Sequence, residues 1–191
     1  SLTLDELTAC GAHQQGHFLL SSGLHSADYL QCALYLAHPR RASHAGQMLA
    51  DAITDAGLDP QMIVAPAMGG LIIGHETARA RDIPFIFTER AEGEMVLRRG
   101  FGLQRGQRVV VVEDVVTTGR STKEVIAILE DHGAAVIGVA SVVNRSGAAQ
   151  PFSPLPSRAL LEVDFPAWSA EYCPLCRDGV PIAKPGSRPI S

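Results

Sequence analysis

Continuous apolar runs, rather than alternating ones, dominate the middle of the chain. Each run is short and reads as a buried strand; the runs are residues 62–66 (MIVAP), 83–89 (IPFIFTE), 108–114 (RVVVVED), 135–143 (AVIGVASVV) and 159–165 (ALLEVDF). Strands that are apolar on both faces are typical of a parallel sheet with helices on each side. The pattern therefore predicts an α/β fold with a mainly parallel central sheet flanked by helices.

Between these runs, apolar residues recur at the spacing of an amphipathic helix. It is clearest over residues 69–81 and 121–133, where Gly133 is expected to end the second helix. Ahead of the sheet, residues 17–32 predict two short strands around a Ser-Gly turn, and residues 38–57 predict a helix. We expect one domain over residues 1–191, with a hood over 1–60, a core over 61–165 and a C-terminal tail over 166–191.

Composition and charge narrow the class of protein. A chain of 191 residues that is 46% hydrophobic and 19% charged is typical of a globular domain with a sizeable core. No apolar run approaches the 18 or more residues of a membrane helix, so no membrane partner is expected. Four cysteines are too few for a disulfide scaffold, which favours a reducing cytoplasm. The net charge of −4 argues against general nucleic-acid binding.

The stretch EDVVTTGRS (113–121) lies at the carboxyl end of the third strand, where parallel sheets bind ligands. Past the acids the chain turns into a helix, and the free backbone N–H groups of a helix N-terminus bind anions. Two carboxylates would repel a bare phosphate, so ribose hydroxyls or Mg²⁺ are their expected partners. Helix capping would explain one acid but not both. The stretch therefore predicts a site for a 5-phosphoribosyl group.

This stretch resembles the phosphoribosyl-diphosphate (PRPP) signature of type I phosphoribosyltransferases: a strand, two acids, two hydrophobics and a Thr/Gly/Ser loop. Other segments resemble the orotate members in order and spacing, namely GHFLLSSGLHSADYLQC, VAPAMGGLIIGHETAR, LRRGF, SVVNRSG and CPLCRDGVPIAKPGSR. The resemblance implies the type I fold with an N-terminal hood and a mobile lid hairpin. It also implies Mg²⁺-dependent transfer of a phosphoribosyl group from PRPP to N1 of orotate. The products would be orotidine 5′-monophosphate, a precursor of UMP, and diphosphate.

Site residues follow from the resemblance position by position. PRPP would contact Glu113, Asp114, Val115, Val116, Thr117, Thr118, Gly119, Arg120 and Ser121, together with the backbone amides of Met68 and Gly69. Orotate would contact Thr117, Arg145, Tyr29 and Leu30. A planar guanidinium suits the orotate carboxylate because it can bind both oxygens at once. Mg²⁺ would be bound through PRPP, so no protein side chain is expected to ligate a metal.

Residues 88–108 join two strands and are rich in glycine and arginine, so we expect a mobile segment. In the family this segment is a lid that reaches the diphosphate in the neighbouring subunit of a homodimer. Arg90 lies nearest the family's loop-base position, and Arg98 and Arg99 are further catalytic candidates. The lid lacks the lysine and histidine of longer-loop members, and arginine does not give up its proton. Elsewhere Ser21 stands where some members carry lysine, and only Tyr29 of the Tyr29–Leu30 pair is aromatic.

Other functions fit these residues less well. A PRPP-sensing regulator would need a nucleic-acid surface, yet residues 1–60 carry two arginines against six acids. A purine or uracil enzyme would have no substrate carboxylate for Arg145. The CPLC stretch (173–176) has no second cysteine pair at zinc-like spacing, and we expect the seven histidines to form no cluster. Simple packing is therefore the expected role of Cys173 and Cys176, and the alternatives are metal binding, including a zinc shared across a dimer, and a redox role.

Overall fold

The structure is a computed structural model that describes residues 1–20 and 22–185. Two positions named from the sequence, Ser21 and the end of the CPLC…GSR segment, lie outside the described residues. The chain divides into two compact units. The first contains residues 1–2 and 36–163, and the second contains residues 3–35 and 164–191.

A six-stranded sheet forms the centre of the first unit, with the strand order β5-β4-β3-β6-β7-β8. Its strands are β3 (Met62–Pro66), β4 (Phe85–Ala91), β5 (Glu94–Val96), β6 (Arg108–Val116), β7 (Ala135–Asn144) and β8 (Ser157–Glu162). Neighbouring strands are parallel except β4 and β5, which form an antiparallel hairpin. The predicted fold class, a mainly parallel sheet with flanking helices, is confirmed.

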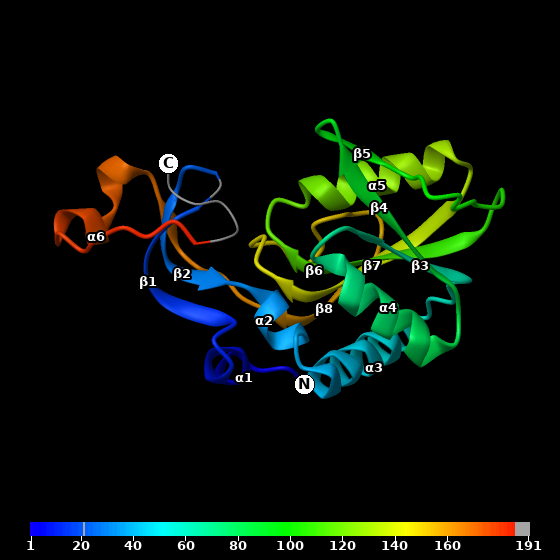
Figure 1. Cartoon of the computed structure of the whole chain (residues 1–191), viewed down its shortest axis with the longest axis horizontal. Coiled ribbons are helices and arrows are strands. Elements are labelled where there is room, and N and C mark those ends of the chain that lie inside the picture. The colour runs from blue at the N-terminus through cyan, green and yellow to red at the C-terminus, as the bar shows by residue number, and fades with distance from the viewer. Residues whose placement is uncertain (21, 186–191) are drawn as a thin grey trace. The chain divides into compact units, whose positions relative to one another are not determined.

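Helices cover both faces of this sheet (Figure 1). Helices α3 (Pro39–Asp55) and α4 (Gly70–Arg81) pack together on one face, and α5 (Arg120–Asp131) lies on the other. The helix predicted over residues 38–57 is therefore α3. It belongs to the first unit rather than to a separate hood, because it packs on α4 and on β7 and β8.

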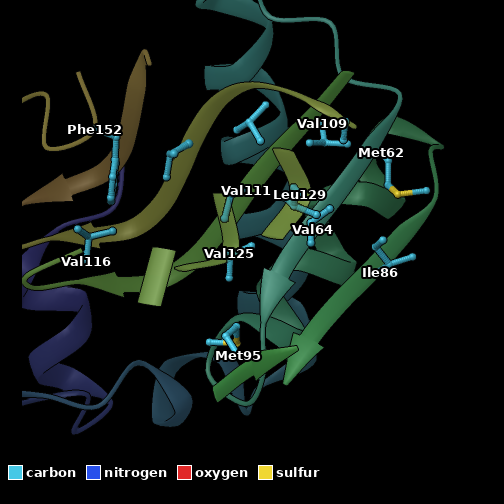
Figure 2. Packing of buried hydrophobic residues seen from close by; sticks show 13 residues of the cluster. Met62, Val64, Ile86, Met95, Val109, Val111, Val116, Val125, Leu129 and Phe152 are labelled. Carbon is cyan, nitrogen blue, oxygen red and sulfur yellow. The ribbon is translucent and has the colours of Figure 1, made fainter. Parts of the chain in front are cut away.

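The apolar runs that predicted the strands form the core. Val64, Val109 and Val111 point to the α5 side, where they meet the fully buried Val125 and Leu129 (Figure 2). Side chains alternate along a strand, so the intervening residues Ile63, Ala65, Val110 and Val112 point to the opposite face. All four are fully buried as well. Burial on both faces explains why these strands lack polar alternation.

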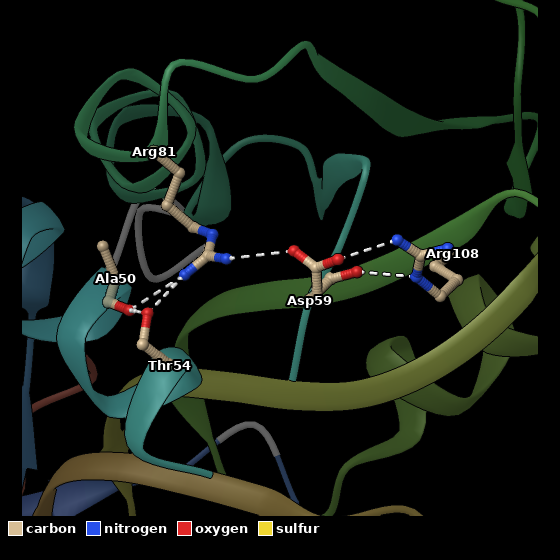
Figure 3. Close-up of polar contacts among 5 residues, drawn as sticks. All are labelled: Ala50, Thr54, Asp59, Arg81 and Arg108. Carbon is tan, nitrogen blue, oxygen red and sulfur yellow. Dashed lines mark hydrogen bonds and ion pairs between the residues drawn. The ribbon is translucent and has the colours of Figure 1, made fainter. Parts of the chain in front are cut away.

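Polar contacts connect the elements at the amino ends of the strands (Figure 3). Arg81 at the end of α4 donates to the Ala50 carbonyl at 3.2 Å and to Thr54 Oγ1 at 2.7 Å, both on α3. Arg108, the first residue of β6, donates to the Asp59 carbonyl and carboxylate, each at 2.8 Å. Because the Asp59 side chain is 82% exposed, the ion pair itself adds only about 0–1 kcal/mol. Arg108 therefore lies at the amino end of β6, not in the lid.

The second unit is a small sheet with the strand order β1-β2-β9, all antiparallel. Its strands are β1 (His13–Leu19), β2 (His25–Leu30) and β9 (Ala167–Trp168). The short helices are α1 (Leu4–Ala9), which starts with a Thr3–Glu6 capping box, α2 (Cys32–Leu36) at the boundary, the 3₁₀ turn η1 (Ala170–Tyr172) and α6 (Pro174–Arg177). The two strands predicted around the Ser-Gly turn are present. Strand β9 and the short helices had no periodic signal in the sequence.

Candidate active site

The β6–α5 connection surrounds a hollow of about 250 Å³ at the carboxyl end of the sheet. Its lining consists of Glu113 and residues 115–122. Glu113 and the Thr/Gly/Ser loop therefore share one concave surface, and Asp114 is the only residue from Glu113 to Thr122 that does not line it. Val116 contributes backbone only, because its side chain is buried in the core cluster.

Gly119 makes the turn between strand and helix possible. Its φ of 70° is left-handed, a conformation that glycine adopts without the steric penalty of a side chain. A Cβ at this position would also lie 2.8 Å from the Phe152 ring. From Arg120 onward the chain is helical, so the first N–H groups of α5 point toward the hollow. This geometry suits an anion that bears several oxygens.

Glu113 and Asp114 differ in environment although they are adjacent. Glu113 is 7% exposed; burial, and then the neighbouring Asp114 charge, raise the pKa of its carboxyl well above the usual value. Asp114 is half-buried, and its Oδ1 accepts from the Val115 amide at 2.7 Å. A buried carboxyl next to an acid costs free energy in the ligand-free chain, which is typical of a functional site.

The β3–α4 loop lies beside Asp114. Gly69 is so close that a Cβ there would be 2.6 Å from an Asp114 carboxylate oxygen. Met68, the residue before it, is 82% exposed, and the Ala67–Met68 peptide bond is cis. Because β3 and β6 are parallel neighbours, their carboxyl-end loops meet at one edge of the sheet. Met68 and Gly69 are thus brought next to the EDVVTTGRS loop.

Arg145 follows β7, the other neighbour of β6. Its backbone amide donates to the Val116 carbonyl at 2.8 Å, immediately before Thr117. Asn144 braces the turn: its Oδ1 accepts from the amide and the hydroxyl of Ser146, at 3.0 and 2.7 Å, and its Nδ2 donates to the Ala148 carbonyl at 2.8 Å. Sequence reasoning missed Asn144, although an asparagine at a strand end before Ser-Gly is a recognisable turn signal.

The lid candidates are paired with acids of the same unit. Arg90 bonds to Glu124 of α5, which also accepts from Arg120 at 3.0 Å. Partial burial raises the pKa of Glu124, but the hydrogen bonds from Arg90 and Arg120 outweigh it and leave this pKa below its usual range. Glu124 was not predicted, although its i,i+4 spacing from Arg120 indicated a pair.

Arg98 and Arg99 share a second acid, Glu89. Arg99 donates at 2.7 Å and lies over the Phe87 ring, with 5.6 Å from its guanidinium carbon to the ring centroid. The hydrogen bonds from Arg99 and Arg98 lower the pKa of Glu89 to about 2. The hairpin is also anchored by apolar side chains that pack on the core, namely Met95, Leu97, Phe101 and Leu103. The hairpin is therefore held more firmly than the glycine content of residues 88–108 suggested.

Tyr29 and Leu30 lie on β2 in the second unit. The Tyr29 ring is tilted against Phe18, with 5.7 Å between centroids, and Leu30 is buried. Their assignment to orotate remains a prediction from the family resemblance.

A parallel sheet whose strand-to-helix loop forms an anion site beside two carboxylates is typical of a type I phosphoribosyltransferase. In agreement, the phosphoribosyl transferase domain model matches residues 33–175. The orotate phosphoribosyltransferase of Carboxydothermus hydrogenoformans is 47% identical over 91% of each chain, and that of Thermotoga maritima is 46% identical over 95% of this chain and 96% of its own. The crystal structure of the Aeropyrum pernix orotate phosphoribosyltransferase superposes with a TM-score of 0.69 at 25% identity, covering 83% of this chain and 92% of that one. The chain belongs to the orotate phosphoribosyltransferase family.

Proposed function

We propose that the chain transfers the 5-phosphoribosyl group of PRPP to N1 of orotate, giving orotidine 5′-monophosphate and diphosphate in pyrimidine biosynthesis. One observation carries this proposal: the hollow at the β6–α5 turn is lined by an anion loop and by Glu113, with Asp114 next in the chain and the Arg145 backbone amide hydrogen-bonded to the Val116 carbonyl. Phosphate, ribose and a substrate carboxylate each have a matching group in this arrangement. The relatives at 46–47% identity are named for this activity.

PRPP would bind along the loops of β6 and β3. The amides and hydroxyls of residues 117–121 would hold the 5′-phosphate at the start of α5. Glu113 and Asp114 would accept hydrogen bonds from the ribose hydroxyls, and this would offset the cost of burying Glu113. The backbone amides of Met68 and Gly69 would face the diphosphate, since Gly69 lies beside Asp114.

Orotate would be recognised by Arg145 and Thr117. The hydrogen bond from the Arg145 amide to the Val116 carbonyl keeps these two residues adjacent. A guanidinium can pair with both oxygens of the orotate carboxylate, and purines and uracil have no such group. This contact would align orotate N1 with the ribose held by the neighbouring loop.

Magnesium fits the same site. Oxygen atoms are the ligands Mg²⁺ prefers, and the site offers carboxylate oxygens beside the place proposed for the ribose and diphosphate. Mg²⁺ would be held through PRPP and would neutralise charge on the departing diphosphate. The chain's own residues would position both substrates, exclude water and stabilise charge as the bond from C1′ to diphosphate oxygen breaks and the bond from orotate N1 to C1′ forms.

Arg90→Ala is expected to lower kcat by about 10²-fold, the typical cost of removing one group that stabilises transition-state charge. Arg90 would leave Glu124 when PRPP binds and turn toward the diphosphate. Arg98 and Arg99 would act in the same way after release from Glu89. Steady-state kinetics with saturating orotate and PRPP measures the effect.

Glu124→Gln is the matched control for Arg90→Ala, because it weakens the same ion pair but keeps the Arg90 charge. We expect Glu124→Gln to keep kcat within a few-fold of the unsubstituted chain. Equal losses in both variants would mean that Arg90 acts only by bracing α5, and the catalytic assignment would then be wrong.

Glu113→Gln is expected to stabilise the ligand-free chain and weaken PRPP binding. The raised pKa of Glu113 means that the fold favours its protonated form. Its contribution to stability is therefore full below the ordinary carboxyl pKa and is lost as pH rises through the raised value. At pH 7 to 8 the variant should melt a few degrees higher, since 1 kcal/mol shifts Tm by about 2–4 °C in a chain of this size. This difference should vanish near pH 4.5.

PRPP affinity should fall by about 10–100-fold in Glu113→Gln, because hydrogen bonds to a charged group contribute about 1.5–3 kcal/mol. Thermal melts across pH and calorimetric titration with PRPP measure the two effects. Asp131→Asn, which removes an exposed carboxylate at the end of α5, is the control and should change neither. A variant that melts lower than the unsubstituted chain at pH 8 would contradict the argument.

The proposed reaction is tested by following orotate absorbance with PRPP and Mg²⁺, and by repeating the assay with hypoxanthine, with uracil and without metal. Loss of orotate that depends on both PRPP and metal supports the function. PRPP binding without consumption of any base would instead favour a PRPP-sensing protein.

Two further expectations from the sequence, the oligomeric state and the location, remain predictions. A homodimer, with the lid serving the neighbouring site, is to be measured by sedimentation of the full chain. A cytoplasmic location rests on the cysteine content. Across the described residues, no helix is both long and apolar enough to pass through a bilayer.

A further inference from the structure

Two histidines and two cysteines converge in the second unit, and none of them takes part in the site described above. They are His17, His25, Cys173 and Cys176, whose potential ligand atoms all lie within 4.8 Å of one another. The prediction that the histidines form no cluster was wrong. The Cys173–Cys176 pair does have two further ligands at zinc-like distances, but they come from the opposite end of the chain.

The β1–β2 hairpin brings the two histidines together. The strand register shifts between Gln15 and Phe18, so a bulge contains His17. Bulges commonly redirect a side chain. His25 pairs with Leu19, two residues beyond His17, which puts both imidazoles on one face of the hairpin. The His17 Nε2 and His25 Nδ1 atoms are 2.9 Å apart.

The third strand brings the cysteines to the same face. Trp168 of β9 pairs with His25, and the chain then passes through η1 directly to Cys173. Cys173 caps α6 and Cys176 lies within it, so this C-x-x-C pair sits on a single tight turn. Cys176 Sγ lies 3.2 Å from His25 Nδ1 and 3.7 Å from His17 Nε2, and Cys173 Sγ lies 3.6 Å from His17 Nε2.

These separations approach those of a tetrahedral zinc centre. Zinc binds imidazole nitrogen at about 2.0–2.1 Å and thiolate sulfur at about 2.3 Å. A tetrahedron with these bond lengths holds its ligand atoms about 3.3–3.8 Å apart. The four observed separations, 2.9 to 3.7 Å, require only small side-chain movements to reach that geometry.

A second hydrogen bond orients His17 as a ligand. Its Nδ1 lies 2.7 Å from the Val180 carbonyl oxygen, which can only accept, so the proton is on Nδ1. The lone pair of neutral His17 is therefore on Nε2, the atom that points toward His25 and both sulfurs. Histidine ligands of metals usually donate their other ring N–H in this way. Val180 follows α6, so the same short segment supplies both thiols and the supporting carbonyl.

The burial of the cluster fits a structural metal with a path for entry. His17, His25 and Cys173 are 3%, 7% and 2% exposed, whereas Cys176 is exposed. Two imidazoles and two thiols this close together have few donors to share, because only one hydrogen can lie between each close pair. A bound cation would use all four lone pairs at once. Two nitrogens and two sulfurs suit zinc better than Mg²⁺ or Ca²⁺.

We propose that His17, His25, Cys173 and Cys176 form a Cys₂His₂ site for a structural zinc ion. The site is closed by four protein ligands, so it would hold the fold together rather than carry out chemistry. It would join the hairpin of residues 13–30 to the segment that follows β9. This unit has a three-stranded sheet in which β9 is only two residues long, and such small sheets need additional support.

The test is metal binding by the full, untagged chain, purified and handled without oxygen. Mass-spectrometric metal analysis should find close to one zinc per chain after dialysis against zinc. Replacement by Co²⁺ should give the ligand-field bands of a tetrahedral centre together with sulfur-to-cobalt charge-transfer absorption. Removal of the metal with a chelator should lower Tm. None of these measurements depends on PRPP, on orotate or on the proposed reaction.

Cys176→Ser is the main variant, because Cys176 is exposed and its replacement should leave the chain folded. Its zinc content at a fixed free zinc concentration should fall at least tenfold, consistent with the 10–100-fold cost of weaker perturbations around metal sites. Cys176→His keeps a ligand and should restore zinc while reducing the charge-transfer absorption. Cys10→Ser and His44→Gln, which lie outside the cluster, should retain zinc like the unsubstituted chain.

Three results would overturn the proposal. The first is a folded, fully reduced chain that takes up neither zinc nor tetrahedral Co²⁺. The second is a Cys10→Ser variant that loses as much zinc as Cys176→Ser. The third is a chain whose Cys173 and Cys176 form a disulfide as isolated and which, after reduction, still binds no metal.

Discussion

Arg145→Ala is expected to lower kcat/KM for orotate by about 10²–10³-fold, while the affinity for PRPP changes little. Removing one partner of a hydrogen-bonded charge pair costs about 2–5 kcal/mol, and here the orotate carboxylate would lose a two-point contact. The Arg145 amide would still donate to the Val116 carbonyl, because that bond uses backbone only. The PRPP loop should therefore keep its shape. Steady-state kinetics and PRPP titration measure the two quantities.

Two further variants accompany Arg145→Ala. Arg145→Lys tests whether the geometry of the guanidinium matters beyond its charge, and Arg105→Ala is the control for the loss of an arginine elsewhere. Lysine keeps the charge but loses the planar fork, so an intermediate loss is expected. Arg105 is exposed and precedes β6, at the opposite end of the strand from the hollow, and its replacement should have no effect. Any residual uracil activity should be unaffected by Arg145→Ala, because uracil has no carboxylate. An unchanged kcat/KM for orotate would remove Arg145 from the substrate site.

Gly119→Ala is expected to weaken PRPP binding and to lower kcat/KM for PRPP by about 10²-fold. An L residue at a left-handed φ costs about 1–2 kcal/mol, and the new Cβ would also lie 2.8 Å from the Phe152 ring. The loop must therefore shift, and a displacement of about 1 Å is enough to cost 10²-fold in rate. Titration with PRPP and steady-state kinetics provide the measurement.

Gly106→Ala is the matched control for Gly119→Ala. Gly106 has a φ of 75°, but a Cβ added there would meet no atom within 4 Å, and it lies at the amino end of β6. Gly106→Ala should lower the stability of the fold, because alanine is strained at a left-handed φ, but it should leave the affinity for PRPP unchanged. The double variant Gly119→Ala/Phe152→Leu removes part of the steric conflict and should recover part of the affinity. A Gly119→Ala chain that binds PRPP normally would contradict the cradle geometry.

The sheet and the PRPP loop could be predicted because their signals are local. Val109 to Val112 are buried on both faces of the sheet, so the run shows no polar alternation in the sequence. The turn after Asp114 needs a glycine and hydroxyl residues at fixed positions, and these are contiguous in the chain. Predicting that Arg145 lies beside Thr117 needed one further step, which was to pair the strands that precede these two residues, β6 and β7.

Features that depend on contacts between distant segments could not be predicted in this way. Arg90 reaches Glu124 across 34 positions, and no periodicity connects a hairpin to a helix beyond it. The lid was expected to be loosely held because of its glycines, yet Met95 and Phe101 pack on the core. His17 is turned toward Cys173 by a strand bulge, and 156 positions separate the two residues. Such proximity follows from tertiary packing alone.

The division of the second unit between the two ends of the chain has a consequence for synthesis on the ribosome. The first unit is complete once Val163 has emerged, and domains generally fold as units while synthesis continues. Residues 3–35 are made before the first unit, but β1 receives its bridge to Ala183 only after that unit has been made. While the larger sheet forms, the β1–β2 hairpin therefore lacks its partner at the β1 edge. Residues 3–35 thus precede the first unit in synthesis but reach their native surroundings after it.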